Sequence, residues 1–211
     1  KSNILPNRDQ EIEAIRYILD QIPQEKLIKL PDEAHMEGGD VMLHNDYIFV
    51  GTHRGDDYAN YITARTNVEA VDEIRKHFPH KIVKSFNLRK SNTDARANAL
   101  HLDCCFQPVG PKYAILHKNG FLEESEYQWL VDFFGKDNIF EITADEMYEM
   151  YSNIFSISEK VVISDASFVR LNEWLRARGI TVEEVHYREI AKQEGLLRCS
   201  TMPLKRERIA K

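Results

Sequence analysis

The stretch Val41-Met-Leu-His-Asn-Asp-Tyr-Ile-Phe-Val50 decides the fold, because it predicts a β-hairpin. Its β-branched and aromatic residues stand on both sides of Asn45-Asp46, a dipeptide that is typical of a turn between two strands. An amphipathic helix over residues 69–78 and a strand over residues 81–86 are predicted after it. The hairpin is therefore the first half of a unit in which two strands, a helix and a third strand follow one another.

The same order of elements returns twice further along the chain. The helices are centred roughly 40 to 60 residues apart, which is typical of a propeller or another repeat architecture. Gly179 is expected to end the last of these helices. The second copy is predicted as strands at 103–109 and 113–117, a helix at 123–134 and a strand at 138–142, and the third as strands at 153–157 and 161–164, a helix at 168–178 and a strand at 181–187.

The two ends of the chain are predicted to hold incomplete parts of this pattern. A helix over residues 9–21 and a short strand at Leu27–Leu30 would be the back half of a further unit, whose front strands would lie before Lys1. Residues 196–209 are predicted to form a final strand pair. The expected organisation is one domain over residues 1–211 that is incomplete at its N-terminus.

Composition limits the classes of function. The chain has 211 residues, of which 43% are hydrophobic, and this suits one soluble domain, since no apolar run approaches the length of a membrane span. Lys and Arg number 28 against 34 Asp and Glu, and no basic stripe indicates nucleic-acid binding. Three cysteines, two of them adjacent as Cys104-Cys105, make a poor disulfide framework and favour the cytoplasm.

One cysteine has a setting that suits chemistry. Cys199 lies in Glu194-Gly-Leu-Leu-Arg-Cys-Ser-Thr-Met-Pro-Leu204, where it is predicted to enter a strand after a glycine. A thiolate is nucleophilic, but it needs a nearby base or positive charge to form at neutral pH. Without such partners, a buried small hydrophobic residue is the more common role of a lone cysteine.

Two upstream segments offer partners for this thiol. In Glu37-Gly-Gly-Asp40 the glycines allow a tight turn or a close approach to a ligand, although a simple turn before a hairpin explains them as well. His101 and Asp103 are predicted to share one face at the start of a strand, where a hydrogen-bonded strand edge is the alternative. Neither a metal nor a cofactor is predicted, because no spaced Cys-x-x-Cys or His-x-x-x-His pair accompanies them.

Four segments in this order resemble the guanidino-group-modifying enzymes, which include arginine deiminases, dimethylarginine dimethylaminohydrolases and glycine amidinotransferases. The resemblance runs from about Asp9 to the C-terminus. It implies the pentein fold, a five-bladed α/β propeller of repeated ββαβ units, here without the front strands of the first blade. The segments are Glu37-Gly-Gly-Asp40, Ala64-Arg-Thr-Asn67, His101-Leu-Asp103 and Arg198-Cys-Ser-Thr201.

The resemblance also implies a role for each matched residue. Cys199 would be the nucleophile, His101 the general acid and base, and Glu37 a carboxylate beside the histidine and the substrate. The implied substrate-binding residues are Asp103, which would anchor the guanidinium, Arg65, which would hold the substrate's carboxylate, and Asp40.

The implied activity is hydrolysis of arginine or a substituted arginine through a thiouronium formed on Cys199. Amidino transfer to an amine is the alternative within enzymes, because a nitrogen nucleophile can trap the same intermediate. A pentein protein that binds without catalysis is the alternative of another class. The expected partner is a small guanidino compound, and assembly into a homo-oligomer stays open.

Two departures from the family pattern accompany the resemblance. The family has a further guanidinium-binding aspartate ahead of the glycine-rich motif, which leads us to expect residues before Lys1 that complete the site. The second departure is the loop Thr52–Thr63, which separates the predicted hairpin from Arg65 and offers Arg54 as a rival. We expect Arg65 to face the site, because it opens the following helix, and loops of this length are often lids or specificity elements.

Overall fold

The computed structural model describes residues 11–206, which fall into two compact units. The first unit comprises the chain up to Leu102 together with Phe121–Glu123. The second unit comprises Asp103–Gly120 and the chain from Glu124 onward. The first two residues of the predicted helix at 9–21 and the last three of the predicted strand pair at 196–209 lie outside the described residues.

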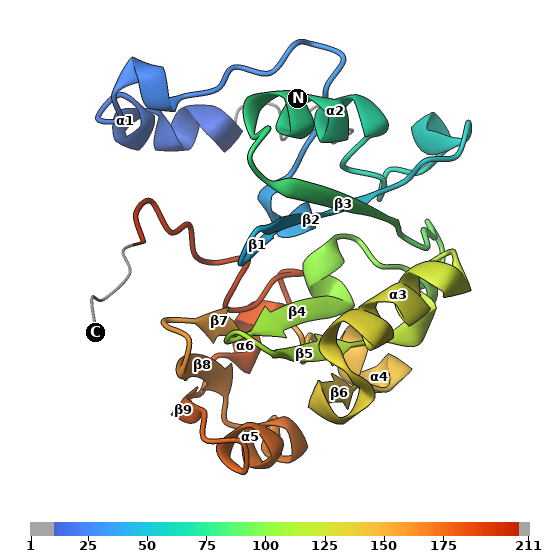
Figure 1. The fold of residues 1–211 in the computed structure, drawn as a ribbon, viewed down its shortest axis with the longest axis vertical. Coiled ribbons are helices and arrows are strands. Elements are labelled where there is room, and N and C mark those ends of the chain that lie inside the picture. The colour runs from blue at the N-terminus through green and yellow to red at the C-terminus, as the bar shows by residue number, and fades with distance from the viewer. Residues whose placement is uncertain (1–10, 207–211) are drawn as a thin grey trace. The chain divides into compact units, whose positions relative to one another are not determined.

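The first unit contains a three-stranded sheet in the order β1-β2-β3 (Figure 1). Strands β1 (Val41–His44) and β2 (Tyr47–Thr52) are antiparallel and form the predicted hairpin. Strand β3 (Ile82–Asn87) runs parallel to β2, and a parallel neighbour requires a crossover connection, which helix α2 (Val68–His77) provides.

Helix α2 is held by its apolar stripe and by its N-cap. Val71 and Ile74 are buried against Ile48 and Val50 of β2, and burying an aliphatic side chain of this size contributes about 1.5–3 kcal/mol. The side chain of Asn67 accepts a hydrogen bond from the backbone N–H of Ala70 at 3.2 Å, which satisfies a donor at the start of the helix. The local sequence and the packing therefore agree on where α2 begins.

A short later segment completes the first unit. Phe121 forms an isolated antiparallel bridge with Leu88, and the backbone N–H of Leu122 donates to the carbonyl of Asn87 at 2.7 Å. The ring of Phe121 meets the ring of Phe86 edge-on, with centroids 5.8 Å apart. The chain after β3 is thus paired with Phe121 and Leu122, which belong to the first unit although they follow Asp103–Gly120 of the second unit in the sequence.

The second unit contains two more sheets of the same topology, in which the first two strands are antiparallel and the third is parallel to the second. In each sheet a helix joins the second strand to the third. The sheets consist of β4 (Phe106–Val109), β5 (Tyr113–Leu116), α3 (Glu124–Phe134) and β6 (Ile139–Glu141), and of β7 (Phe155–Ser156), β8 (Val161–Asp165), α5 (Val169–Arg176) and β9 (Thr181–Val185).

The predicted order of strand, strand, helix and strand is confirmed three times, but the prediction at the N-terminal end is wrong. A 3₁₀ turn at Glu11–Ile15 and helix α1 (Arg16–Leu19) replace one long helix. Residues 24–26 form another 3₁₀ turn, and Leu27–Leu30 is not a strand. A strand needs a neighbour for its backbone groups, and none of the described residues pairs with this segment.

Two predictions at the site segments are also wrong in their local structure. Residues 197–200 form a turn rather than a strand entry, because Ser200 N–H bonds to the carbonyl of Leu196 at 3.0 Å. No strand follows through Arg206. Likewise, Leu102–Cys104 is a 3₁₀ turn and β4 begins only at Phe106, so His101 and Asp103 do not stand on a strand.

Two short helices of the second unit were not predicted. They are α4 (Ala144–Tyr148) and α6 (Arg188–Ala191). No helix within residues 11–206 is both long and apolar enough to cross a membrane.

Candidate active site

In the first unit, Glu37 and His101 form a close pair. Glu37 immediately precedes the 3₁₀ turn Gly38–Asp40, which leads into β1, and His101 lies one residue before Leu102, where the long segment of the unit ends. The Nε2 atom of His101 is 2.6 Å from Oε2 of Glu37. A carboxylate at this distance favours a proton on the nitrogen that faces it, and so it fixes both the tautomer and the orientation of the ring.

The second glycine of the Glu37-Gly-Gly-Asp40 motif is required by this histidine. A Cβ atom added at Gly39 would lie 2.8 Å from both Cγ and Nδ1 of His101. A Cβ atom added at Gly38 would meet nothing within 4 Å. The backbone of Gly39 therefore packs directly against the imidazole and leaves no room for a side chain, whereas Gly38 has room for one.

Asp40 is engaged by the protein itself. Its side chain is 1% exposed, and its two oxygens accept hydrogen bonds from the Thr66 hydroxyl at 2.7 Å and from the backbone N–H of Leu102 at 2.9 Å. A buried carboxylate with both oxygens occupied ties segments together. Asp40 thus links the turn before β1 to the residues beside Arg65 and His101.

Arg65 joins the same group of side chains. Its Nη1 atom donates to Oε1 of Glu37 at 3.0 Å, and the residue is 8% exposed. Its Nε atom is buried and has no hydrogen-bond acceptor among residues 11–206. Arg54, the rival, is exposed and reaches Ser85 Oγ at 3.4 Å. The structure therefore brings Glu37, His101 and Arg65 together, whereas the side chain of Arg54 contacts Ser85 of β3.

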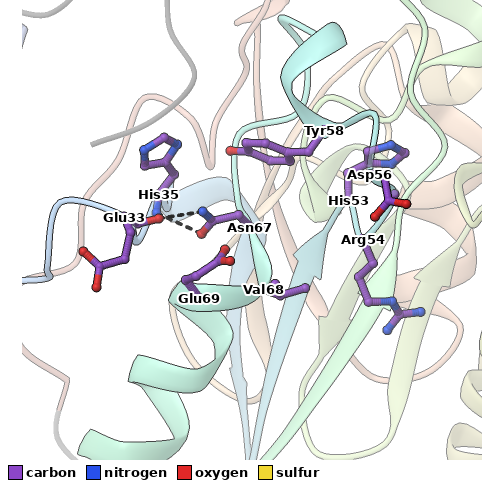
Figure 2. Close-up of a pocket in the computed structure, with 10 residues that line it drawn as sticks. Glu33, His35, His53, Arg54, Asp56, Tyr58, Asn67, Val68 and Glu69 are labelled. Atoms are coloured by element: carbon purple, nitrogen blue, oxygen red, sulfur yellow. Dashed lines mark hydrogen bonds between the residues drawn. The ribbon is translucent and has the colours of Figure 1, made fainter.

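The loop Thr52–Thr63 helps to form a pocket in the first unit. The pocket has a volume of about 380 Å³, and the loop, the segment before β1 and the start of α2 line it (Figure 2). The hydroxyl of Tyr58 is buried and has no hydrogen-bond partner in the described part of the chain. Burial raises the pKa of Tyr58, and the carboxylates of Asp40 and Glu37 raise it further, so this phenol stays protonated.

In the second unit, Cys199 lies beside Asp103. The Sγ atom of Cys199 is 3.8 Å from Oδ2 of Asp103, and the Asp103 side chain is 0% exposed. The Nε atom of Arg198 lies 3.3 Å from the same oxygen. The buried carboxylate of Asp103 therefore contacts both the thiol of Cys199 and the guanidinium of Arg198.

Some groups around Cys199 raise the pKa of its thiol, and others lower it. Desolvation of the sulfur raises the pKa of the Cys199 thiol, and the negative charge of Asp103 raises it further. A hydrogen bond from Asn153 and the positive charge of Arg198 lower the pKa, but their effect is smaller. The net effect of these groups of the second unit is to raise the pKa of Cys199 and to favour the thiol over the thiolate.

Asn153 is a site residue that the sequence reasoning missed. Its Nδ2 atom is 3.2 Å from Cys199 Sγ, while its Oδ1 atom accepts from the backbone N–H groups of Arg198 at 3.1 Å and Cys199 at 3.2 Å. The sequence indicated only the first residue of a strand at this position. No local pattern connects Asn153 to a turn 46 residues later.

The other two cysteines have different settings. Cys105 is buried, and Cys104 Sγ lies 3.9 Å from the second oxygen of Asp103. No group of three or more His, Cys, Asp or Glu side chains within residues 11–206 could hold a metal ion.

Solved structures share this fold. One is the product-bound N-terminal domain of ArgZ, an arginine dihydrolase from the ornithine-ammonia cycle in cyanobacteria, with 18% identity, a TM-score of 0.72, and coverage of 93% of this chain and 64% of that chain. Another is a cysteine-to-serine mutant of the dimethylarginine dimethylaminohydrolase from Pseudomonas aeruginosa, complexed with citrulline, with 21% identity, a TM-score of 0.70, and coverage of 92% and 66%. These similarities confirm the pentein fold.

The sequence comparison is more specific. The family model for eukaryotic N,N dimethylarginine dimethylhydrolase matches residues 6–206, so the chain belongs to this family. An uncharacterised protein of Bacillus subtilis (strain 168), YkgA, is 27% identical over 173 residues, which is 82% of this chain and 53% of that protein. The chain thus spans about half the length of this curated relative.

Proposed function

We propose that this chain carries the catalytic residues of a hydrolase that cleaves a guanidino C–N bond, with arginine or a substituted arginine as substrate. The observation that carries the proposal is the pair of Cys199 and Asp103, in which the thiol lies 3.8 Å from a fully buried carboxylate. A nucleophile beside a cation-binding group is what attack on a guanidinium requires. Family membership supports the same choice of chemistry.

Recognition of the substrate would rest on Asp103. A guanidinium is planar and cationic, and carboxylates hold it by charge-assisted, paired hydrogen bonds. Asp103 already lies 3.3 Å from one guanidinium nitrogen, that of Arg198. This contact supports the proposal that the same carboxylate also anchors the guanidinium of the substrate.

The reaction would proceed in two halves. The Cys199 thiolate attacks the guanidinium carbon and a C–S bond forms. The C–N bond then breaks, the departing amine takes a proton from His101, and a thiouronium remains on Cys199. Water, deprotonated by His101, attacks this carbon, and the C–S bond breaks to give a urea and the free thiolate. Glu37, 2.6 Å from the imidazole, would stabilise its charged form.

The residues that we assign to the reaction come from both units. His101 belongs to the first unit and Asp103 to the second, yet only Leu102 separates them in the chain. The family model also spans residues 6–206. We therefore propose that both units belong to one pentein domain that acts on one substrate.

Arg65 and Asp40 would have different roles. The Nε atom of Arg65 is a buried donor with no acceptor among the described residues, which supports binding of the substrate's carboxylate. Both oxygens of Asp40 accept hydrogen bonds from the protein. We propose that Asp40 positions Thr66 and Leu102 and does not bind substrate.

The test is a product analysis with a panel of guanidino compounds. The full-length protein is incubated with arginine, methylated arginines, agmatine and guanidino acids, with and without glycine, and ureas and new guanidino compounds are quantified. We expect a urea whether or not glycine is present, and we expect Cys199→Ser to abolish it while Cys104→Ser retains it. A new guanidino product that requires glycine would replace hydrolysis by amidino transfer. Binding without turnover or an adduct on Cys199 would identify a non-catalytic binding protein.

A further inference from the structure

Asn153 is bound to the Cys199 turn through both ends of its amide. The residue is 1% exposed and lies two residues before β7. Its Oδ1 atom accepts from the backbone N–H groups of Arg198 and Cys199, at 3.1 and 3.2 Å. Its backbone carbonyl also accepts from the N–H of Arg198, at 3.3 Å. The turn that carries the thiol is therefore held by one buried residue.

These bonds decide which end of the amide faces the sulfur. The oxygen and nitrogen of an asparagine amide are assigned from their hydrogen-bond partners. Two backbone N–H groups can only donate, so the amide oxygen must face them. The NH₂ group is then left to point at Cys199 Sγ, 3.2 Å away, and the sulfur must act as the acceptor.

A donor aimed at sulfur favours the thiolate over the thiol. The charged groups that face Cys199 in the second unit are Asp103, at 3.8 Å, and Arg198, its neighbour in the chain. The negative charge of Asp103 disfavours a second negative charge on the sulfur. Asp103 also forms an ion pair with Arg198, at 3.3 Å. Asn153 supplies a neutral donor that acts on the sulfur itself.

We infer that Asn153 is the positioning residue of the nucleophile: it fixes the Cys199 turn and stabilises the thiolate by donating a hydrogen bond from Nδ2. Its neighbour extends this function, since the Ser152 hydroxyl donates to the backbone carbonyls of Asp103 at 2.8 Å and Cys104 at 2.7 Å. Adjacent residues therefore hold the thiol on one side and the carboxylate on the other. The separation of nucleophile and anchor is set by the Ser152–Asn153 pair.

The catalytic importance of Asn153 rests on the proposed function, but its effect on the Cys199 thiol can be measured without a substrate. The measurement is the rate at which iodoacetamide alkylates Cys199 as a function of pH, read by mass spectrometry of the Cys199 peptide. Cys104 and Cys105 serve as internal references in the same sample. The variants are Asn153→Asp, which keeps the shape but replaces the donor by a charge, and Asn153→Ala, which removes the amide. Asn172→Ala is the control, because Asn172 is a fully buried amide bonded to Asp165 and Glu184 instead.

We expect Asn153→Asp to move the midpoint of the Cys199 profile upward by at least about one pH unit, which is a tenfold loss of thiolate at neutral pH. Asn153→Ala should move it upward by less, and Asn172→Ala should leave it unchanged. If both Asn153 variants fold and follow the wild-type profile, the inference is wrong. A shifted profile in a protein that turns over no guanidino compound would refute the proposed function and leave this inference standing.

A second measurement uses the wild-type protein, in case both variants fail to fold. In a ¹⁵N-labelled sample, the side-chain amide signal of Asn153 is followed through the same pH range. We expect it to titrate with the midpoint found for Cys199 alkylation. An Asn153 amide signal that does not change as Cys199 ionises would overturn the inference.

Discussion

The carboxylate of Glu37 joins two side chains, because Oε2 lies 2.6 Å from His101 Nε2 and Oε1 accepts from Arg65 Nη1 at 3.0 Å. The position of the imidazole and that of the guanidinium are therefore set by one side chain. A change at Glu37 should disturb both.

Replacing Glu37 by glutamine should lower kcat toward the best substrate of the panel by about 10²–10⁴-fold, the range that general acid–base catalysis contributes. The amide keeps the shape but loses the charge that stabilises the imidazolium. Steady-state kinetics measure the effect, with Asp72→Asn as a control, since Asp72 is an exposed carboxylate of α2 paired with Arg75. A kcat for Glu37→Gln equal to that of the control would contradict this role.

The two glycines of the Glu37-Gly-Gly-Asp40 motif should differ in their tolerance of a methyl group. Gly39→Ala places Cβ 2.8 Å from the ring of His101, so the ring must move, and overpacking of this kind destabilises by roughly 1–3 kcal/mol. Gly38→Ala meets nothing within 4 Å and should behave as wild type. Urea unfolding and turnover are measured for both variants. Equal effects at the two positions would show that the backbone turn, not His101, requires glycine.

The stability of the second unit should depend on pH through Asp165. Burial by itself would raise the pKa of Asp165, but hydrogen bonds from Ser167 and from the backbone N–H groups of Tyr187 and Arg188 outweigh it and lower the pKa. A lowered folded-state pKa means that the unfolded chain binds the proton more tightly. The contribution of Asp165 to stability is therefore complete above about pH 4 and is lost as the pH falls through the folded-state pKa.

The variant Asp165→Asn tests this pH dependence. We expect it to be less stable than wild type at pH 7, and to lack part of the loss that wild type shows in acid. Urea midpoints across the acidic range provide the comparison, and Asp132→Asn, which changes an exposed carboxylate of α3, is the control. Parallel curves for wild type and Asp165→Asn would exclude Asp165 as the titrating group.

Two hydroxyl deletions in the first unit should have opposite results. Tyr58→Phe removes a buried hydroxyl that has no partner among residues 11–206, so the free energy of unfolding should stay the same or rise by about 1 kcal/mol. Thr66→Val removes a hydroxyl that donates to Asp40 and accepts from the backbone N–H of Glu37, so it should destabilise by about 1–3 kcal/mol. Chemical denaturation compares the two. A loss for Tyr58→Phe as large as for Thr66→Val would reveal a partner for the phenol.

The repeated units could be predicted because their signals are local. Alternating apolar residues, a turn dipeptide and an amphipathic helix define each unit within about 45 residues. The hairpin around Asn45-Asp46 and helix α2 were located within one or two residues by such patterns. Helix α4 also has a local signal, a capping box between Thr143 and Glu146.

The remaining errors arise where hydrogen bonds, not patterning, decide the structure. Cys199 was expected on a strand, but Asn153 and the carbonyl of Leu196 bind the backbone of its segment into a turn. Asp103 was expected on the same strand face as His101, but Leu102 donates its N–H to Asp40 and the chain turns there. Both structures depend on partners 46 or more residues away, which no window along the sequence contains.

The strip Phe121–Glu123 has a consequence for how the protein is made. Because Phe121 pairs with Leu88, just after β3, the edge-on contact between the rings of Phe86 and Phe121 can form only after residue 121 has been synthesised. A nascent chain that ends at Leu102 has all three strands of the first sheet but not this cover. Translation must therefore pass through 18 residues of the second unit before the last segment of the first unit is made.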